Sequence, residues 1–135
     1  MKYLLFIPIL FFVFCKTDSS NSTSSSNSDD AEKIARKDIS VTEAHDWLLS
    51  DNAPVLLDVR TPEEYSEGHI EGATLIDYND SSFDSEIGKL DKDATYLIYC
   101  RSGGRSGKAV HKMIGTGFKD VTNMEGGYNA WSSKY

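Results

Sequence analysis

The chain has 135 residues and a net charge of −7, from 21 acidic and 14 basic side chains. This length suits one domain with a hydrophobic core, and the acidity argues against nucleic acid as a partner, because phosphate neutralisation needs a basic surface. The two cysteines, Cys15 and Cys100, lie in unlike contexts, so we expect no disulfide between them and exclude a disulfide-stapled scaffold.

Residues 1–15 have the features of a secretory signal. Lys2 precedes an apolar run that is shorter than the ~20 residues of a membrane-spanning helix. The run ends at Cys15, and polar residues follow at once. This arrangement resembles a bacterial lipoprotein signal with Cys15 as the acylated residue, although Phe14 stands where such signals usually carry a small side chain. An uncleaved signal anchor and a signal cut elsewhere are the alternatives.

Residues 16–35 are predicted to form a disordered tether. Half of residues 17–30 are serine and none is hydrophobic, so this segment cannot build a core. A flexible tether of this kind holds a folded domain off a membrane. We therefore expect an extracytoplasmic protein of the bacterial cell envelope, lipid-anchored to a membrane through Cys15, with its folded domain over residues 36–135.

Strands and helices are predicted to alternate through this domain. Expected strands cover residues 37–39, 55–59, 73–77, 95–99 and 121–124, and expected helices start near residues 41, 62, 83, 106 and 127. Ser40 with Glu43, and Thr61 with Glu64, are capping signals for the first two helices. The continuous apolar run over 55–59 is typical of a strand covered on both faces. The pattern predicts an α/β domain with a mainly parallel sheet, whose ligands bind at the carboxyl ends of the strands.

A glycine-rich loop with two arginines follows the fourth predicted strand. Its sequence is Cys100-Arg101-Ser102-Gly103-Gly104-Arg105-Ser106. A strand, a tight loop and a helix N-terminus in this order form a cradle of backbone N–H groups for an anion. Such donors and nearby guanidiniums lower a thiol pKa below its free value of ~8.5. Cys100 is therefore the candidate nucleophile, and the alternative is a small buried hydrophobic residue that ends a strand.

Several other polar residues have structural interpretations. Asp58 and Arg60 are expected to form an ion pair or a turn hydrogen bond beneath the loop, and a catalytic role is the alternative for this pair. His69 is expected to lie in a turn among glycines. His45 and His111 fall on predicted polar helix faces. No pair of histidines has the spacing of metal ligands, so we expect no metal.

Three motifs in order give the domain a resemblance to the rhodanese family, and more narrowly to its single-domain sulfurtransferases. The motifs are residues 56–73, with Asp58-Val59-Arg60 and Gly68-His69-Ile70, then the loop 100–106, and then Met124-Glu125-Gly126-Gly127 with Trp131. The resemblance implies about five parallel strands flanked by helices. It also implies a thiosulfate sulfurtransferase activity.

In that activity, the resemblance makes Cys100 the residue that takes sulfane sulfur from thiosulfate, or a similar small anionic donor, as a persulfide. The sulfur then passes to cyanide or a thiol. Backbone N–H groups of residues 101–106 would hold the persulfide, and Arg101 and Arg105 the oxygens of the substrate. We expect no cofactor and a monomer.

Two other functions stay open. One is a persulfide relay or anion-binding module with little activity of its own. The other is a phosphatase, because the same fold hosts cysteine phosphatases. Those enzymes generally carry an arginine six positions after the cysteine, whereas here Arg105 comes five positions after it and Ser106 follows. The shorter loop favours sulfur over the bulkier phosphate.

Overall fold

The computed structural model describes residues 37–135, so the expectations for residues 1–36, including Cys15, lie outside the described residues. The strands are β1 (Lys37–Ile39), β2 (Val55–Asp58), β3 (Thr74–Leu75), β4 (Thr95–Tyr99) and β5 (Asp120–Met124). The helices are α1 (Val41–Leu48), α2 (Pro62–Glu67), α3 (Phe83–Gly88), α4 (Gly104–Gly115) and α5 (Gly127–Lys134). The predicted alternation is confirmed.

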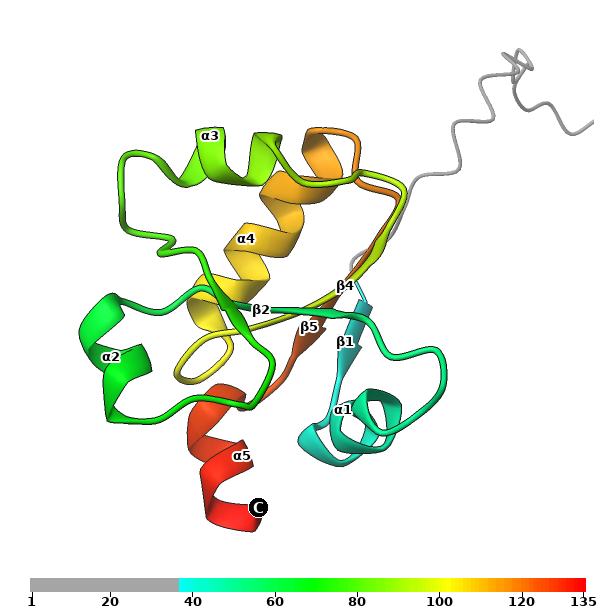
Figure 1. The fold of residues 1–135 in the computed structure, drawn as a ribbon, viewed down its shortest axis with the longest axis vertical. Helices are drawn as coiled ribbons and strands as arrows, with labels where there is room; N and C mark the ends of the chain where they lie inside the picture. The colour runs from blue at the N-terminus through cyan, green and yellow to red at the C-terminus, as the bar shows by residue number, and fades with distance from the viewer. Residues whose placement is uncertain (1–36) are drawn as a thin grey trace, which may run out of the picture. The chain divides into compact units, whose positions relative to one another are not determined.

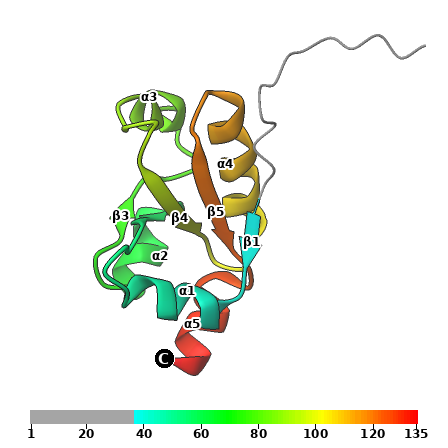
Figure 2. The ribbon, with the colours of Figure 1, turned by 90° about the vertical axis from the view of Figure 1, so that its right-hand side faces the viewer.

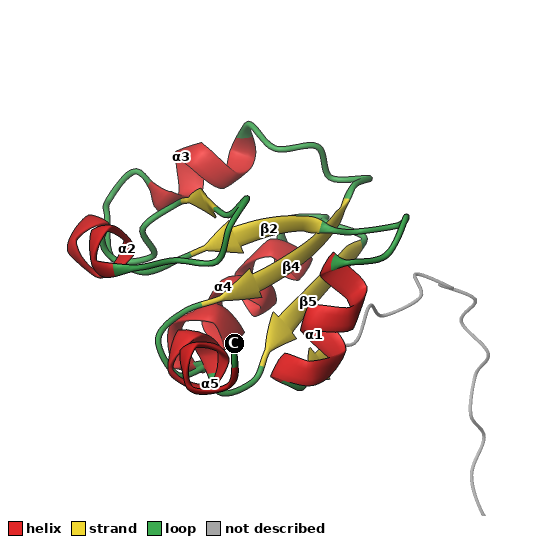
Figure 3. Cartoon of the chain, turned by 60° about the horizontal axis from the view of Figure 1, so that its bottom comes forward, coloured by secondary structure: helices red, strands yellow, loops and turns green. Residues whose placement is uncertain are grey.

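The five strands form one parallel sheet in the order β1-β5-β4-β2-β3. Figure 2 shows β5 between β4 and β1. β4 is the central strand of the sheet, and the arrowheads of β2, β4 and β5 point toward the side where α2 and α5 lie (Figure 3). The carboxyl ends of the strands therefore meet at one edge, as expected for a ligand site in such a fold.

Helices cover both faces of the sheet (Figure 1). On one face, side chains of α3 and α4 pack with Leu57, Ile98 and Val121 of the sheet. On the other face, side chains of α1, α2 and α5 pack around Leu97 and Tyr99. β4 is apolar along most of its length because its successive side chains enter these two cores in turn.

Both predicted capping boxes are present. The side chains of Ser40 and Thr61 accept hydrogen bonds from the N3 backbone N–H groups, and Glu43 and Glu64 accept from the cap residues in return. Two elements, β3 and α4, have a boundary that differs from the prediction by more than one residue. β3 has only two residues, because it is an edge strand that pairs with β2 alone. α4 begins two residues before 106, since Gly103, with φ of 102°, makes the left-handed turn that starts the helix directly.

Within residues 37–135, no helix has the length and apolar character needed to cross a membrane.

Candidate active site

Cys100 lies at the carboxyl end of β4, in front of the N-terminus of α4. Its Sγ accepts a hydrogen bond from the backbone N–H of Gly103 at 3.1 Å and another from the Oγ–H of Ser106 at 3.4 Å. The residue is buried, with 1% of its surface exposed, and belongs to the core between β4 and α4. It is therefore as buried as a structural cysteine would be, but its sulfur faces polar donors rather than apolar side chains alone.

These donors decide the charge of the sulfur. Burial by itself would raise the pKa of the Cys100 thiol. Hydrogen bonds from the hydroxyl and backbone of Ser106, and from the backbone of Ser102 and Gly103, outweigh burial and hold the pKa below its ordinary value. The loop thus favours a thiolate, which is the nucleophilic form of cysteine.

Arg105 is hydrogen-bonded to Glu64, for which the sequence predicts only a role in the N-terminal cap of α2. Its Nη1 donates to Glu64 Oε2 at 2.6 Å, and its Nη2 donates to Glu64 Oε1 at 2.7 Å. Hydrogen bonding to Glu64 is the main reason that the pKa of Arg105 is raised, and the charge of Cys100 adds to it. The same pair lowers the pKa of Glu64 to about 2. No sequence signal indicates this contact, because the partners lie 41 positions apart.

The other loop residues are more accessible. Arg101, Ser102 and Gly104 are exposed, Gly103 is half-buried, and Ser106 is fully buried beside the sulfur. Among residues 37–135, no hydrogen bond or ion pair engages the guanidinium of Arg101. Arg101 is therefore the arginine of the loop whose charge is available to a ligand.

The start of α5 is hydrogen-bonded to the backbone of Cys100 and Arg101. The N–H of Tyr128 donates to the carbonyl of Cys100 at 2.8 Å, and the N–H of Asn129 donates to the carbonyl of Arg101 at 3.0 Å. Gly127 makes this approach possible, because a Cβ there would lie 2.4 Å from the Cys100 carbonyl oxygen. Gly126 and Gly127 belong to the third sequence motif, but nothing in the sequence indicates their contact with the loop.

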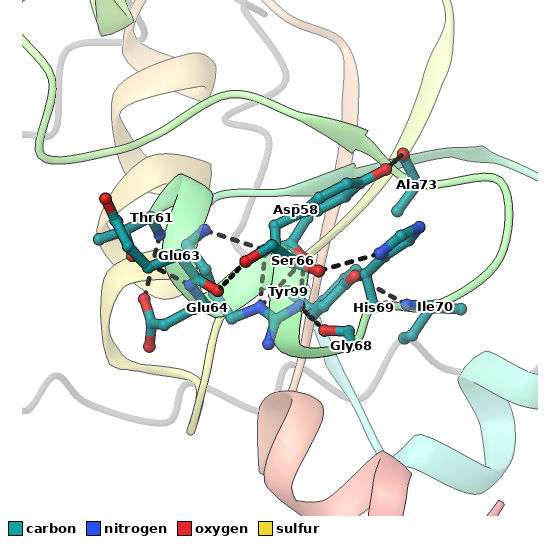
Figure 4. Close-up of polar contacts among 12 residues, drawn as sticks. Asp58, Thr61, Glu63, Glu64, Ser66, Gly68, His69, Ile70, Ala73 and Tyr99 are labelled. Atoms are coloured by element: carbon teal, nitrogen blue, oxygen red, sulfur yellow. Dashed lines mark hydrogen bonds and ion pairs between the residues drawn. The ribbon is translucent and has the colours of Figure 1, made fainter.

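Asp58 and Arg60 form the predicted buried ion pair. Arg60 donates from Nη2 to Asp58 Oδ2 at 2.6 Å and to the Gly68 carbonyl at 2.7 Å (Figure 4). The Cζ of Arg60 also lies 4.2 Å from the centre of the Tyr128 ring. This pair ties the end of β2 to the turn after α2 and to α5, which is a structural role.

In residues 37–135, no hydrogen bond joins a histidine to Cys100. His69 stacks on Tyr65, and its Nδ1 lies 3.0 Å from the Tyr65 carbonyl, as suits a turn residue. His111 is exposed on α4, as predicted. His45 is half-buried rather than fully solvated, because it stacks on Tyr135, the residue that follows α5. In the described part of the chain, no three His, Cys, Asp or Glu side chains cluster as metal ligands would.

This sheet and the loop that follows β4 are typical of a known class of domain. The model of the rhodanese-like domain matches residues 40–134, so the chain belongs to the rhodanese-like family.

Known relatives include sulfurtransferases. The chain is 38% identical to thiosulfate sulfurtransferase 16, chloroplastic, of Arabidopsis thaliana, over 70% of this chain and 85% of that relative. It is 36% identical to the probable adenylyltransferase/sulfurtransferase MoeZ of Mycobacterium tuberculosis over 78% of this chain, but it spans only 27% of that longer protein. The crystal structure of a rhodanese-like domain protein from Staphylococcus aureus aligns with a TM-score of 0.65 at 35% identity, covering 70% of this chain and 90% of that one.

Proposed function

We propose that the protein is a thiosulfate sulfurtransferase that works through a persulfide on Cys100. The observation that carries the proposal is the hydrogen bonding of the Cys100 sulfur by Gly103 and Ser106 at the start of α4. A sulfur anion in that position, whether thiolate or persulfide, is stabilised by preorganised donors. The name of the Arabidopsis relative supports thiosulfate as the donor.

The reaction has two balanced steps. The Cys100 thiolate attacks the outer sulfur of thiosulfate, an S–S bond forms, and the bond from that sulfur to the sulfonate group breaks to release sulfite. An acceptor, cyanide or a thiolate, then attacks the outer sulfur of the persulfide, and Cys100 leaves as the thiolate. A covalent intermediate between two half-reactions predicts ping-pong kinetics. Arg101 is the cation proposed for the oxygens of the sulfur donor, and the Nε–H of Arg105, whose charge is paired with Glu64, is proposed as a further hydrogen-bond donor to them.

The proposal includes the cellular setting. Lipidation of Cys15 would anchor the domain to a membrane of the bacterial envelope, with residues 16–35 as the tether. The active unit is proposed to be a monomer whose partners are the small sulfur donor and acceptor. Two experiments test the lipid anchor. Envelope fractions are extracted with and without detergent, and the intact mass of the wild type is compared with that of Cys15→Ser. An acyl mass that is lost in the variant supports the anchor, and an unmodified Cys15 contradicts it.

Turnover tests the activity directly. The full chain is mixed with thiosulfate and cyanide, and thiocyanate is followed, with Cys100→Ser as the control. We expect turnover in the wild type alone, and a gain of one sulfur atom on Cys100 when thiosulfate is added without cyanide. A chain that accepts sulfur from a persulfide protein but never from thiosulfate would be a relay module and would contradict this proposal.

A further inference from the structure

A polar pocket with a volume of about 330 Å³ opens beside the loop that carries Cys100. This volume falls in the range of small-molecule sites, about 300–1,000 Å³. Its lining includes two arginines and two glutamates, Arg60, Arg101, Glu64 and Glu67, together with residues of α5. The four formal charges sum to zero, unlike a site built for a dianion alone.

Two of these charges are already paired within the protein. Arg60 is only 3% exposed and is neutralised by Asp58. Glu64 is neutralised by Arg105. Each therefore contributes shape and hydrogen-bonding atoms to the pocket more than net charge.

The other two charges are uncommitted. In residues 37–135, neither Arg101 nor Glu67 has a hydrogen bond or ion pair to its charged group. Both are exposed at the same pocket. One free cation and one free anion in a single small pocket are complementary to a ligand that carries both charges.

The pocket is fixed relative to the nucleophile. Arg101 follows Cys100 directly in the chain, and the N–H groups of Tyr128 and Asn129 bind the carbonyls of these two residues. Tyr128 and Asn129 also line the pocket. A thiol held there would thus lie beside the loop on which the persulfide forms.

We propose that this pocket binds the sulfur acceptor, and that the acceptor is a zwitterionic α-amino thiol of the cysteine class. Its carboxylate pairs with Arg101 and its ammonium with Glu67. Its thiolate attacks the outer sulfur of the Cys100 persulfide, the S–S bond to Cys100 breaks, and the products are the Cys100 thiolate and the persulfide of the acceptor. This inference rests on the proposed function, because it requires a persulfide on Cys100.

The test is a single turnover of the loaded full chain with three thiols. Cysteine carries both charges, 3-mercaptopropionate lacks the ammonium, and cysteamine lacks the carboxylate. Loss of the extra sulfur from Cys100 is followed by mass spectrometry, and rates are corrected for the thiolate fraction of each acceptor. We expect cysteine to be faster than either analogue by about fivefold, the scale of one solvent-exposed ion pair.

Variants assign the two charges. Glu67→Gln should remove the advantage of cysteine over 3-mercaptopropionate, and Arg101→Gln its advantage over cysteamine. The matched control is Glu63→Gln, which changes an exposed carboxylate of the same helix that does not line the pocket and should keep both ratios. Equal rates for the three thiols, or an unchanged ratio in Glu67→Gln, would overturn the inference while leaving the proposed function intact. Failure of thiosulfate to load Cys100 would overturn both.

Discussion

Arg105, in the segment that follows Cys100, forms a bidentate ion pair with Glu64, with N–O distances of 2.6 and 2.7 Å. The Glu64 oxygen that accepts from Arg105 Nη1 also accepts from the backbone N–H of Thr61 at 3.0 Å. One carboxylate therefore joins the N-cap of α2 to the first turn of α4. This contact couples the first motif of the chain to the loop of Cys100.

The Glu64–Arg105 pair should contribute measurably to stability, because both side chains are three-quarters buried and the geometry is bidentate. A double-mutant cycle with Glu64→Gln and Arg105→Gln, measured by urea unfolding, should give a coupling energy of about 1 kcal/mol. Lys89 and Glu86 form an exposed pair and provide the control cycle, with a smaller coupling. If the two substitutions change the free energy of unfolding additively, the ion pair contributes no coupling energy and the prediction is wrong.

The same pair predicts the behaviour of the protein in acid. The pKa of Glu64 is lowered to about 2 in the folded state, so the unfolded state binds more protons between about pH 4.5 and 2. The stabilisation is present above the unfolded pKa and is lost as the pH falls toward 2. In Glu64→Gln, the free energy of unfolding should therefore depend less steeply on pH in this window than in wild type. Parallel curves for the two proteins would contradict the assignment.

Ser106 should tune the nucleophile. Ser106→Ala removes the hydroxyl that donates to the Cys100 sulfur while leaving the backbone donors in place. We expect the pKa of the Cys100 thiol to rise, because the variant loses a hydrogen bond that stabilises the charged sulfur. The rate of Cys100 alkylation by iodoacetamide, measured against pH, reports this shift because only the thiolate reacts. If the pH profile of the rate is the same in Ser106→Ala and wild type, the hydroxyl does not act on the sulfur.

Alanine substitutions at Gly127 and Gly72 distinguish the effect of steric crowding of a new Cβ from that of backbone strain. Both have positive φ, 57° and 82°, so alanine is strained at each by about 1–2 kcal/mol. A Cβ at Gly127 would meet the Cys100 carbonyl at 2.4 Å, whereas a Cβ at Gly72 meets nothing within 4 Å. Gly127→Ala should therefore lose about 1–3 kcal/mol more stability than Gly72→Ala, and sulfur transfer with it. Equal losses of stability in the two variants would show that the close approach of α5 to the loop does not contribute to stability.

Most of the fold was predictable because its signals are local. The capping boxes at Ser40 and Thr61 mark two helix starts, and continuous apolar runs mark the central strands. The length of β3 could not be predicted in this way, because it depends on pairing with β2 at the edge of the sheet. The start of α4 depends on the left-handed backbone of Gly103, which glycine permits but does not require.

The candidate site was predictable only in part, for the same reason. Cys100 and its loop donors lie within seven consecutive residues, so their chemistry could be inferred from spacing. The Glu64 partner of Arg105, the N–H groups of Tyr128 and Asn129, and the free charge of Glu67 come from distant segments. Tertiary packing alone brings them to the loop.

The central claim is that the loop holds the Cys100 sulfur as an anion, and titration of that thiol tests it most directly. The ultraviolet absorbance of the thiolate is followed against pH in the full chain, with Cys100→Ser subtracted to remove the signals of tyrosine and Cys15. We expect the pKa of the Cys100 thiol to lie below that of a free cysteine thiol titrated in the same buffer. A pKa for Cys100 equal to or above that of the free thiol would contradict this expectation.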